Sequence, residues 1–505
     1  MSKRSPPVPT SPTPGAEIEL KLALPADGGA ALLRKLAAVP ALARHKPVHQ
    51  QVHNLYYDTP DQALRRQRAA LRIRRVDGAG APQWLQTLKT ADAGLSALSR
   101  RGEWEVPVDG PALQQDALRE APPWRRLDPD GTLFAALKPC FSTDFERTRW
   151  TVRLRGGISI EVALDVGQIV AEGRTAPVCE LELELLSGPP EALLRLAGQI
   201  ARRVAVLPLS ASKAQRGFAL AQGVLDAPQR ARPPVPPRRA SLQALAVPLL
   251  SEMFDQFTAN LHALLGADHP ELVHQARVGW RRFRSALRLL GPGLAVPPPA
   301  WPGLQPLLDL LGELRDLDVA CTQTLPTLQP AYVAGDARRA LTWAAVEQSF
   351  RAAATLQRKA VRLALQEPLT GQALLGITHW LEALGAAPQV PAVPARRWAR
   401  ERVARLRLRW KKARRDAVDA AGQHRARLLA KRLRYNIEAL RPLLPERAGR
   451  WHERASQLQA DVGALRDTVQ AGVLAARLEA PPEVLAFLRG VAVGLEPPVV
   501  PDDGV

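Results

Sequence analysis

The N-terminal part of the chain alternates between polar and apolar residues over short runs. The run EIELK places Glu17, Glu19 and Lys21 on one side of an extended strand and Ile18 and Leu20 on the other, because successive side chains of a strand point to opposite faces. Similar runs follow, namely HNLYYD, ALRIRRVD, QWLQTLK, RGEWEVPV, RTRWTVRL, ISIEVALD and CELELELL. They predict about eight β-strands, with a few helices between them, from residue 16 to residue 222.

The pattern changes beyond a proline- and arginine-rich stretch at 223–240, which predicts an extended, exposed linker. From 241 to 493 apolar residues recur at helical spacing between proline and glycine breaks, so this part should be all α-helical. Residues 1–15 and 494–505 should form a disordered leader and a tail. The predicted fold is therefore α+β in two domains.

The helical part contains an internal repeat. The segment HQARVGWRRFRSALRLL begins at His274 and its counterpart HRARLLAKRLRYNIEAL begins at His424, while LGELRD at Leu311 recurs as VGALRD at Val462. The two offsets, 150 and 151 residues, are nearly equal. They indicate a duplication and predict two four-helix bundles related by a pseudo-twofold axis.

Charge and cysteine content restrict the possible partners and compartment. The formal charge is +20, which points to nucleic acid, a membrane surface or a phosphate compound. No apolar run approaches the roughly 18 residues of a membrane span, the leader lacks the apolar core of a signal peptide, and the three cysteines are widely spaced. These features predict a soluble, cytoplasmic protein without a membrane partner. They say nothing about the oligomeric state.

Each repeat aligns cations on one face of a helix. At 100° per residue, the first column falls within a stripe about 80° wide, and the second column keeps the same spacing. A solvated basic face is one explanation, but like charges three and four residues apart repel by a few tenths of a kcal/mol, so an anion that neutralises the columns is favoured. The columns consist of His274, Arg277, Arg281, Arg284 and Arg288, and of His424, Arg427, Lys431 and Arg434.

A phosphate polymer fits these columns better than nucleic acid. Arginine dominates them, and its planar fork suits bidentate contacts with phosphate. Nucleic-acid binders usually interleave aromatic platforms with their basic residues. Here the aromatic residues fall off the stripe or at its margin, where core packing explains them: Trp280, Phe283, Trp410 and Tyr435. Nucleic acid is therefore an unlikely partner.

The charged faces of the strands divide by sign. Carboxylates lie on the first strand and the last, whereas arginine and lysine occupy most of the strands between. A sandwich with wet outer faces would look the same strand by strand. The combination instead favours a closed antiparallel barrel with a polar interior, in which the first and last strands meet and hold a divalent cation while the others hold a polyanion.

Two families share these motifs. EIELK matches the ExExK signature of the CYTH family, the triphosphate tunnel metalloenzymes, and LRIR, QTLK, RGEWE, EVALDVGQIV, CELELELLSG and SKAQRGFAL extend the resemblance from residue 16 to about 220. The repeated helical motifs resemble the CHAD domain, the conserved histidine α-helical domain, from about 241 to 480. The arrangement is similar to that of bacterial CYTH-CHAD inorganic triphosphatases.

The resemblance implies hydrolysis of inorganic triphosphate to diphosphate and phosphate in an eight-stranded tunnel with Mg²⁺ or Mn²⁺. It also implies a helical module that binds inorganic polyphosphate and is compatible with association with polyphosphate granules. By this resemblance the catalytic residues are Glu17, Glu19, Lys21 and Lys89; the substrate ligands are Arg72, Arg74, Arg101, Arg147, Arg149, Lys213 and Arg216; the metal ligands are Glu17, Glu19, Glu182 and Glu184; and the polyphosphate ligands are the residues of the two columns.

Alternatives stay open on this evidence. The chain could be a non-catalytic polyphosphate-binding or granule-targeting protein, or a triphosphatase or cyclase that acts on an organic triphosphate. Glu103, Glu105 and Glu161 could be structural partners of the arginines, and the two column histidines could pack between helices. Lys213 lies in a predicted loop or short helix, where a lysine side chain is usually exposed to solvent.

Overall fold

The computed structural model describes residues 16–25, 29–78, 80–91, 96–234, 241–388, 394–460 and 463–495. The predicted leader and nearly all of the predicted tail lie outside these ranges. The chain divides into two units, each described by itself below. The first runs up to Ala227 and also includes Gln366–His379, and the second comprises Pro228–Leu365 and the chain from Trp380 onward.

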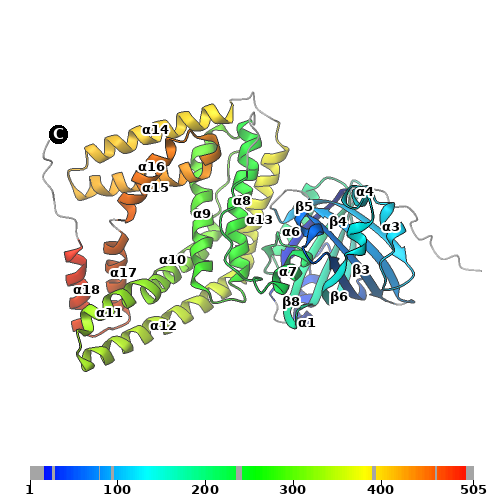
Figure 1. The fold of residues 1–505 in the computed structure, drawn as a ribbon, viewed down its shortest axis with the longest axis horizontal. Coiled ribbons are helices and arrows are strands. Elements are labelled where there is room, and N and C mark those ends of the chain that lie inside the picture. Colours follow the sequence, from blue (N-terminus) through cyan, green and yellow to red (C-terminus); the bar gives the residue numbers. More distant parts are fainter. Residues whose placement is uncertain are drawn as a thin grey trace, which may run out of the picture. The chain divides into compact units, whose positions relative to one another are not determined.

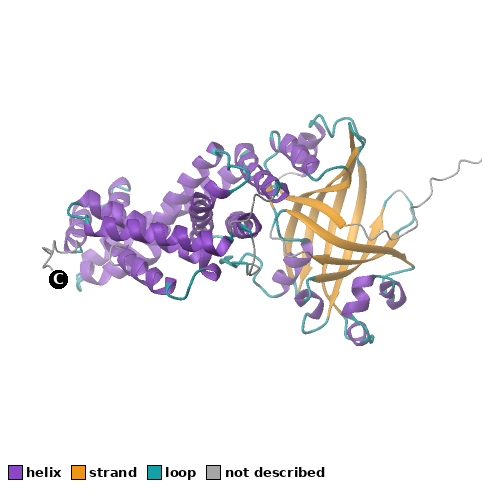
Figure 2. Ribbon diagram, turned by 90° about the horizontal axis from the view of Figure 1, so that it is seen from above, coloured by secondary structure: helices purple, strands orange, loops and turns teal. Residues whose placement is uncertain are grey.

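Eight strands of the first unit close into an antiparallel barrel, as predicted (Figure 2). Neighbours follow the order β5-β4-β3-β2-β6-β7-β8-β1, and β1 pairs back with β5. A two-residue strand, β9 (Leu207–Pro208), adds to β1. The barrel strands are β1 (Ala16–Ala23), β2 (Val48–Asp58), β3 (Ala69–Asp77), β4 (Gln83–Ala91), β5 (Leu98–Val108), β6 (Lys138–Leu154), β7 (Ile158–Ala171) and β8 (Arg174–Ser187).

Strand β1 lies between β5 and β8, so the first strand and the last long strand meet. Glu19 is opposite Glu184 and Lys21 is opposite Glu182 across the β1–β8 pair, while Glu17 is opposite Arg101 across the β1–β5 pair. The prediction that barrel closure brings the glutamate-bearing strands together is confirmed.

Helices on the outer side explain why the charges of β1 face inward. Leu20 and Leu22 are fully buried in an apolar cluster together with residues of α1 (Gly29–Ala37) and α6 (Glu191–Ala201). Because these helices cover the outer face of the sheet, the apolar side chains pack outward against them. The alternate side chains then have only the barrel interior to occupy.

Helix α7 (Lys213–Ala221) directs two cations into the barrel. It begins with a capping box between Ser212 and Gln215, which satisfies backbone N–H groups of the first turn. Gly217 lies against the ring of Phe141, and a Cβ atom at this position would come within 2.1 Å of that ring. This close approach buries Lys213 and Arg216 on the first turns of the helix. The remaining short helices are α2 (Ala63–Arg66), α3 (Gln115–Arg119), α4 (Pro122–Leu127) and α5 (Thr132–Ala135).

The second unit is helical, as predicted (Figure 1). Corresponding helices of the two repeats pack against each other, α9 against α15 and α10 against α17, as a twofold relation requires. The helices are α8 (Leu242–Ala263), α9 (Pro270–Leu290), α10 (Gln305–Val319), α11 (Leu325–Val333), α12 (Ala337–Leu365), α14 (Ala395–Arg415), α15 (Ala420–Leu440), α16 (Ala448–Ala460), α17 (Gly463–Arg477) and α18 (Pro482–Gly494). Helix α13 (Pro368–Ala386) belongs to the first unit up to His379 and to the second from Trp380. A π-helical turn, Ala320–Thr324, joins α10 to α11.

One apolar core of this unit draws on both repeats. Trp343 and Phe350 of α12 pack with Leu474 of α17 and Leu488 of α18, so helices from the second repeat complete a core begun by the first. The structure therefore interleaves the repeats, whereas the sequence periodicity predicted a pair of separate bundles without indicating which helices share a core.

Part of the predicted linker is held against α8. The Gln229 backbone N–H donates to Asn260 Oδ1 (3.0 Å), and Asn260 Nδ2 donates back to the Gln229 carbonyl (2.9 Å). Residues 228–234 are thus fixed on the helical unit, although several of their side chains are exposed, as predicted. Within the ranges that the structure covers, no helix combines the length and apolar character that crossing a bilayer requires.

Candidate functional site

The strand registers place the predicted charged residues on the inner face of the barrel. Every cation predicted there lies within 4.0 Å of a carboxylate oxygen. The interior is therefore a network of ion pairs and not a wall of free positive charge. The cations are Lys21, Arg72, Arg74, Lys89, Arg101, Arg147, Arg149, Lys213 and Arg216.

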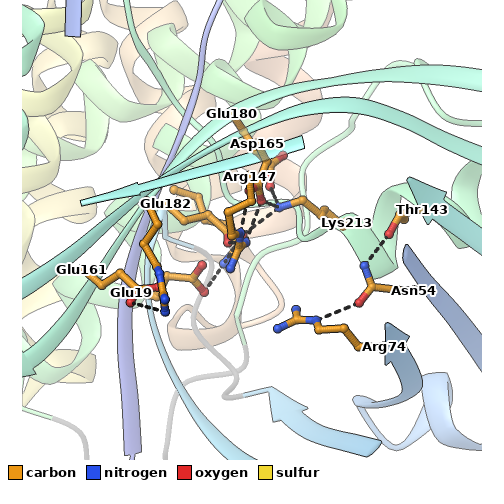
Figure 3. Close-up of polar contacts among 12 residues, drawn as sticks. Glu19, Asn54, Arg74, Thr143, Arg147, Glu161, Asp165, Glu180, Glu182 and Lys213 are labelled. Atoms are coloured by element: carbon orange, nitrogen blue, oxygen red, sulfur yellow. Dashed lines mark hydrogen bonds and ion pairs between the residues drawn. The ribbon is translucent and has the colours of Figure 1, made fainter. Parts of the chain in front are cut away.

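Six residues form what we call the deep ion cluster: Arg147, Lys213, Arg216, Asp165, Glu180 and Glu182. Figure 3 labels all of them except Arg216. The guanidinium of Arg147 donates two hydrogen bonds of 2.7 Å to Asp165 and one of 2.7 Å to Glu182. The Lys213 ammonium contacts Asp165 at 2.6 Å and Glu182 at 3.0 Å. Arg216 pairs with Glu180 at 3.1 Å. These short, charge-assisted contacts hold the strands β6, β7 and β8 to helix α7.

The deep ion cluster differs from the predicted metal site. Among the described residues, the acidic groups whose oxygens come within 4.8 Å of one another are Asp165, Glu180 and Glu182, and Glu182 alone belongs to the predicted set. The Lys213 ammonium already binds all three carboxylates. It occupies the position that a cation would need, so we interpret this group as structural.

Sequence reasoning left Asp165 and Glu180 out of the site although a signal existed. Asp165 is opposite Arg147 across β6–β7 and opposite Glu180 across β7–β8, so the three residues lie in one row of the sheet. Alternation had placed them on the charged faces of their strands. Only the register between the strands reveals that they meet.

A second group lies on β3, β4 and β5. Arg72 is 3.7 Å from Glu103 and 3.9 Å from Glu105, and Arg74 is 3.6 Å from Glu105. Lys89 contacts Glu103 at 3.1 Å. Burial would raise the pKa of Glu103, but Lys89, Arg72 and Arg74 outweigh it and lower that pKa to about 2. Glu103 therefore remains ionised at all ordinary pH values.

Arg72 is the least satisfied cation of this group. It is 7% exposed, and its Nε and Nη2 atoms are buried without a hydrogen-bond acceptor among the described residues. Its one hydrogen bond within the described ranges is a long one, 3.3 Å, to the Tyr56 hydroxyl. A buried donor without an acceptor is costly, so this guanidinium is suited to bind an anion.

Arg74 is held in place by neutral side chains. Its Nε donates to Asn54 Oδ1 (2.9 Å), and Asn54 Nδ2 donates to Thr143 Oγ1 (2.8 Å) (Figure 3). Asn54 and Thr143 are almost fully buried, which fixes the orientation of the guanidinium. The sequence analysis did not identify these two residues, because neutral polar residues on strands carry no distinctive pattern.

Negative charge is in excess where β1 meets β8. Lys89 lies 3.0 Å from Glu17, and Lys21 pairs with Glu19. The Glu184 carboxylate forms no hydrogen bond or ion pair within the described part of the chain. Burial, and then the charge of Glu17, raise the pKa of Glu184 to about 8, and burial also raises the pKa of Glu17.

The helical unit gathers cations from both repeats. Lys431 lies among Arg281, Arg427, Arg434 and Arg466, and its burial together with these charges lowers its pKa to about 8. Burial and neighbouring arginines likewise lower the pKa values of Arg277 and Arg281. The Nε atoms of Arg281, Arg427 and Arg434 are buried without an acceptor among the described residues. Such a cluster is suited to bind an anion.

The two predicted columns do not contribute equally. Arg284 and Arg288 are exposed and lie toward one end of α9, and Arg288 faces Arg432 of α15. His274 is half-buried and lies near Arg315 and Arg277. The side chain of His424 lies outside the described part of the structure. Arg466 was missed, although it occupies in VGALRD the position that Arg315 occupies in LGELRD.

Comparison with known proteins identifies both units. Residues 15–218 match the model of the CYTH domain, and residues 248–476 match the model of the CHAD domain. The chain is therefore a CYTH-CHAD protein, as its motifs predicted.

Particular relatives extend this result. Over 207 residues the chain is 38% identical to the inorganic triphosphatase of Haemophilus influenzae, an alignment that covers 40% of this chain and 54% of that protein. The chain thus matches about half the length of this curated relative. Among solved structures, the CHAD domain of Ricinus communis is 27% identical, with 53% of this chain and 91% of that chain covered and a TM-score of 0.46. A putative adenylyl cyclase from Hippeastrum, described as having a dominant triphosphatase activity, is 23% identical, with 41% and 95% covered and a TM-score of 0.31.

Proposed function

We propose that the barrel hydrolyses inorganic triphosphate to diphosphate and phosphate with the help of a divalent cation, and that the helical unit binds inorganic polyphosphate. One observation carries the first part: among the described residues, the same barrel interior holds a carboxylate without an ion-pair partner, Glu184, and buried guanidinium donors without acceptors, those of Arg72. A site with both an unneutralised carboxylate and unsatisfied guanidinium donors is suited to bind a metal ion together with a polyanion. The 38% sequence identity with the inorganic triphosphatase of Haemophilus influenzae supports this choice of substrate.

The residues on β1 and β8 suit a hard divalent cation. Mg²⁺ and Mn²⁺ prefer oxygen ligands. Burial raises the pKa values of Glu17 and Glu184, and the charges of neighbouring carboxylates raise them further. We assign Glu17, Glu19 and Glu184 to the metal. Glu182 is engaged by Arg147 and Lys213, so its part is to fix the deep ion cluster. A bound cation would neutralise phosphate oxygens and activate water for attack.

The remaining side chains bind and orient the phosphate chain. Arg72 and Arg74 project into the barrel from alternate positions of β3, and Lys89 lies beside them on β4. Phosphoryl transfer depends chiefly on placement and charge compensation, so these cations with the glutamates form a sufficient set.

Phosphate release tests the proposed reaction directly. The purified chain is incubated with tripolyphosphate, ATP or thiamine triphosphate, each with Mg²⁺, Mn²⁺ or EDTA. We expect release from tripolyphosphate with either metal and none with EDTA. Faster release from ATP or thiamine triphosphate would instead favour an organic substrate. Binding without release under every condition would favour a recruitment protein.

Polyphosphate binding by the helical unit should be linked to proton uptake. Burial and neighbouring arginines hold the pKa of Lys431 near 8, and a bound polyanion would raise it. Near pH 8.5 we therefore expect uptake of up to about one proton per site, measured by calorimetry in buffers of different ionisation enthalpy. Lys431→Gln should abolish this uptake and weaken binding about tenfold.

The control for this experiment is Lys412→Gln, which removes the same charge from an exposed position of α14. It should leave both the proton uptake and the affinity for polyphosphate unchanged. Equal losses in the two variants would mean that binding follows the overall charge of the unit and not the cluster around Lys431.

A further inference from the structure

The ion pairs inside the barrel are of two kinds. In the deep ion cluster the cations contact the carboxylates at hydrogen-bond distance, with values of 2.5–3.1 Å for Arg147, Lys213 and Arg216. The carboxylates of β5, Glu103 and Glu105, are instead 3.6–3.9 Å from the nearest guanidinium nitrogens of Arg72 and Arg74. At the longer separation the Coulomb attraction remains, but the charge-assisted hydrogen bond is absent.

Glu105 has a partner of its own, separate from the arginines. It accepts a hydrogen bond of 2.8 Å from Thr87 Oγ1, a fully buried hydroxyl on β4. Its loose contacts with Arg72 and Arg74 thus leave the donors of Arg72 unsatisfied. An anion that reached these donors at hydrogen-bond distance would replace a weak interaction with a strong one.

Lys89 would keep a partner during such an exchange. It lies 3.1 Å from Glu103 and 3.0 Å from Glu17, so loss of the contact with Glu103 leaves the contact with Glu17 in place. Arg74 would likewise stay oriented by its hydrogen bond to Asn54. The exchange therefore requires no rearrangement of the groups that position the cations.

We propose that Glu103 and Glu105 are displaceable counter-ions that occupy Arg72, Arg74 and Lys89 until a chain of phosphates replaces them, and that this exchange selects anions of high charge density. The identity of the incoming anion rests on the proposed function. Only non-covalent contacts change. Each carboxylate of the deep ion cluster contacts two cations at hydrogen-bond distance, whereas Glu103 has one such contact, with Lys89, so the deep ion cluster does not take part.

This exchange discriminates between a single phosphate and a chain. Arg72 and Arg74 are two residues apart on one strand, so their backbone positions are about 7 Å apart. A single phosphate group can bind one guanidinium, and to do so it must displace the carboxylate that lies near that guanidinium. A chain reaches both arginines, and its second contact forms at high effective concentration. Tripolyphosphate should therefore bind far better than orthophosphate.

The test removes the competing charge and measures binding. Glu105→Gln keeps the shape of the side chain and an oxygen that can accept from Thr87. We expect it to bind tripolyphosphate about tenfold more tightly than the parent in EDTA, the factor that corresponds to 1.4 kcal/mol, and to discriminate less against orthophosphate. Isothermal titration calorimetry of the full chain gives both constants. Arg277→Gln and Lys431→Gln are present throughout, in the parent as in the variants, so that the weakened contribution of the helical unit is the same in every comparison.

Two further variants make the result decisive. Glu103→Gln should shift affinity in the same direction as Glu105→Gln, and it provides a second measurement if one variant folds poorly. Glu146→Gln makes the same change of charge at an exposed position on the outer side of β6, and should leave affinity unchanged within about twofold. Equal or weaker binding by both β5 variants would overturn the proposal alone. Absence of tripolyphosphate binding in parent and variants, with or without Mg²⁺, would overturn it together with the proposed function.

Discussion

Glu184→Gln should have opposite effects on stability with and without a divalent cation. The pKa of Glu184 is raised to about 8, so the folded state binds its proton more tightly than the unfolded state, whose pKa is about 4.5. The parent therefore loses stability as the pH rises from about 4.5 to 8. Glutamine cannot ionise. In EDTA at pH 9 the variant should be more stable by roughly 2 kcal/mol, after allowance for partial exposure, and at pH 5 the two should unfold alike.

In millimolar Mg²⁺ the parent should be more stable than Glu184→Gln, the reverse of the order expected in EDTA at pH 9. A ligand that binds only the folded state stabilises it, and the variant lacks one oxygen ligand for the cation. Release of phosphate from tripolyphosphate should fall at least about 100-fold, because metal ions supply several kcal/mol of transition-state stabilisation. Thermal unfolding with Mg²⁺ or EDTA at each pH, followed by the phosphate assay, checks both expectations. Glu146→Gln is the matched control. If Mg²⁺ stabilised parent and Glu184→Gln equally, the metal could not lie at this carboxylate.

Lys213→Met should lower the free energy of unfolding of the barrel by about 3–5 kcal/mol at neutral pH, because removal of one partner leaves buried charge uncompensated. Asp165 and Glu180 are both 0% exposed, and Lys213 is 5% exposed. Methionine can fill the volume but cannot replace the ammonium. Urea unfolding followed by circular dichroism measures the loss. Lys35→Met, at an exposed position of α1, should change stability by less than about 0.5 kcal/mol.

The deficit of Lys213→Met should shrink as the pH falls. Burial opposes ionisation of Asp165 and Glu182, but Arg147 and Lys213 outweigh it and hold both pKa values below their ordinary range. Their contribution is present above the unfolded pKa values near 4 and is lost as the pH falls through the folded values. In Lys213→Met the ionised carboxylates contribute less to stability, so the variant loses less stability than the parent as the pH falls. A deficit that stayed constant down to pH 3 would show that Lys213 is not coupled to these carboxylates.

The arrangement of the barrel could be inferred from sequence because strand alternation assigns each side chain to a face. For EIELK alone the choice of inner face was open. The combined signs of charge on several strands resolved it, and the outer helices that bury Leu20 and Leu22 supply the physical reason. The helical repeat could also be inferred from sequence. The core that the two repeats share could not, because periodicity shows which face of a helix is apolar and not which helix packs against it.

The pairing of charges could not be inferred in the same way. Alternation placed Arg147 and Glu182 on charged strand faces, and the family resemblance added Lys213, with no indication that the three bind one another. Their distances depend on register, on the approach of α7 to Phe141 and on burial, which are properties of the folded chain. Glu184 and Glu182 belong to one alternating run, yet within the described part of the chain Glu184 has no ion-pair partner, whereas Glu182 pairs with Lys21, Arg147 and Lys213.

Helix α13 bears on how the protein can be dissected. Its residues up to His379 belong with the barrel unit, where Leu375 is buried in the apolar cluster that includes Leu20 and residues of α6, and Gln372 donates to the Ala201 carbonyl at 3.3 Å. A fragment that stops in the proline-rich stretch would contain every barrel strand and still lack these residues, so apolar side chains that they cover would be exposed to water. Fragment boundaries drawn from motif matches would therefore yield a destabilised barrel unit.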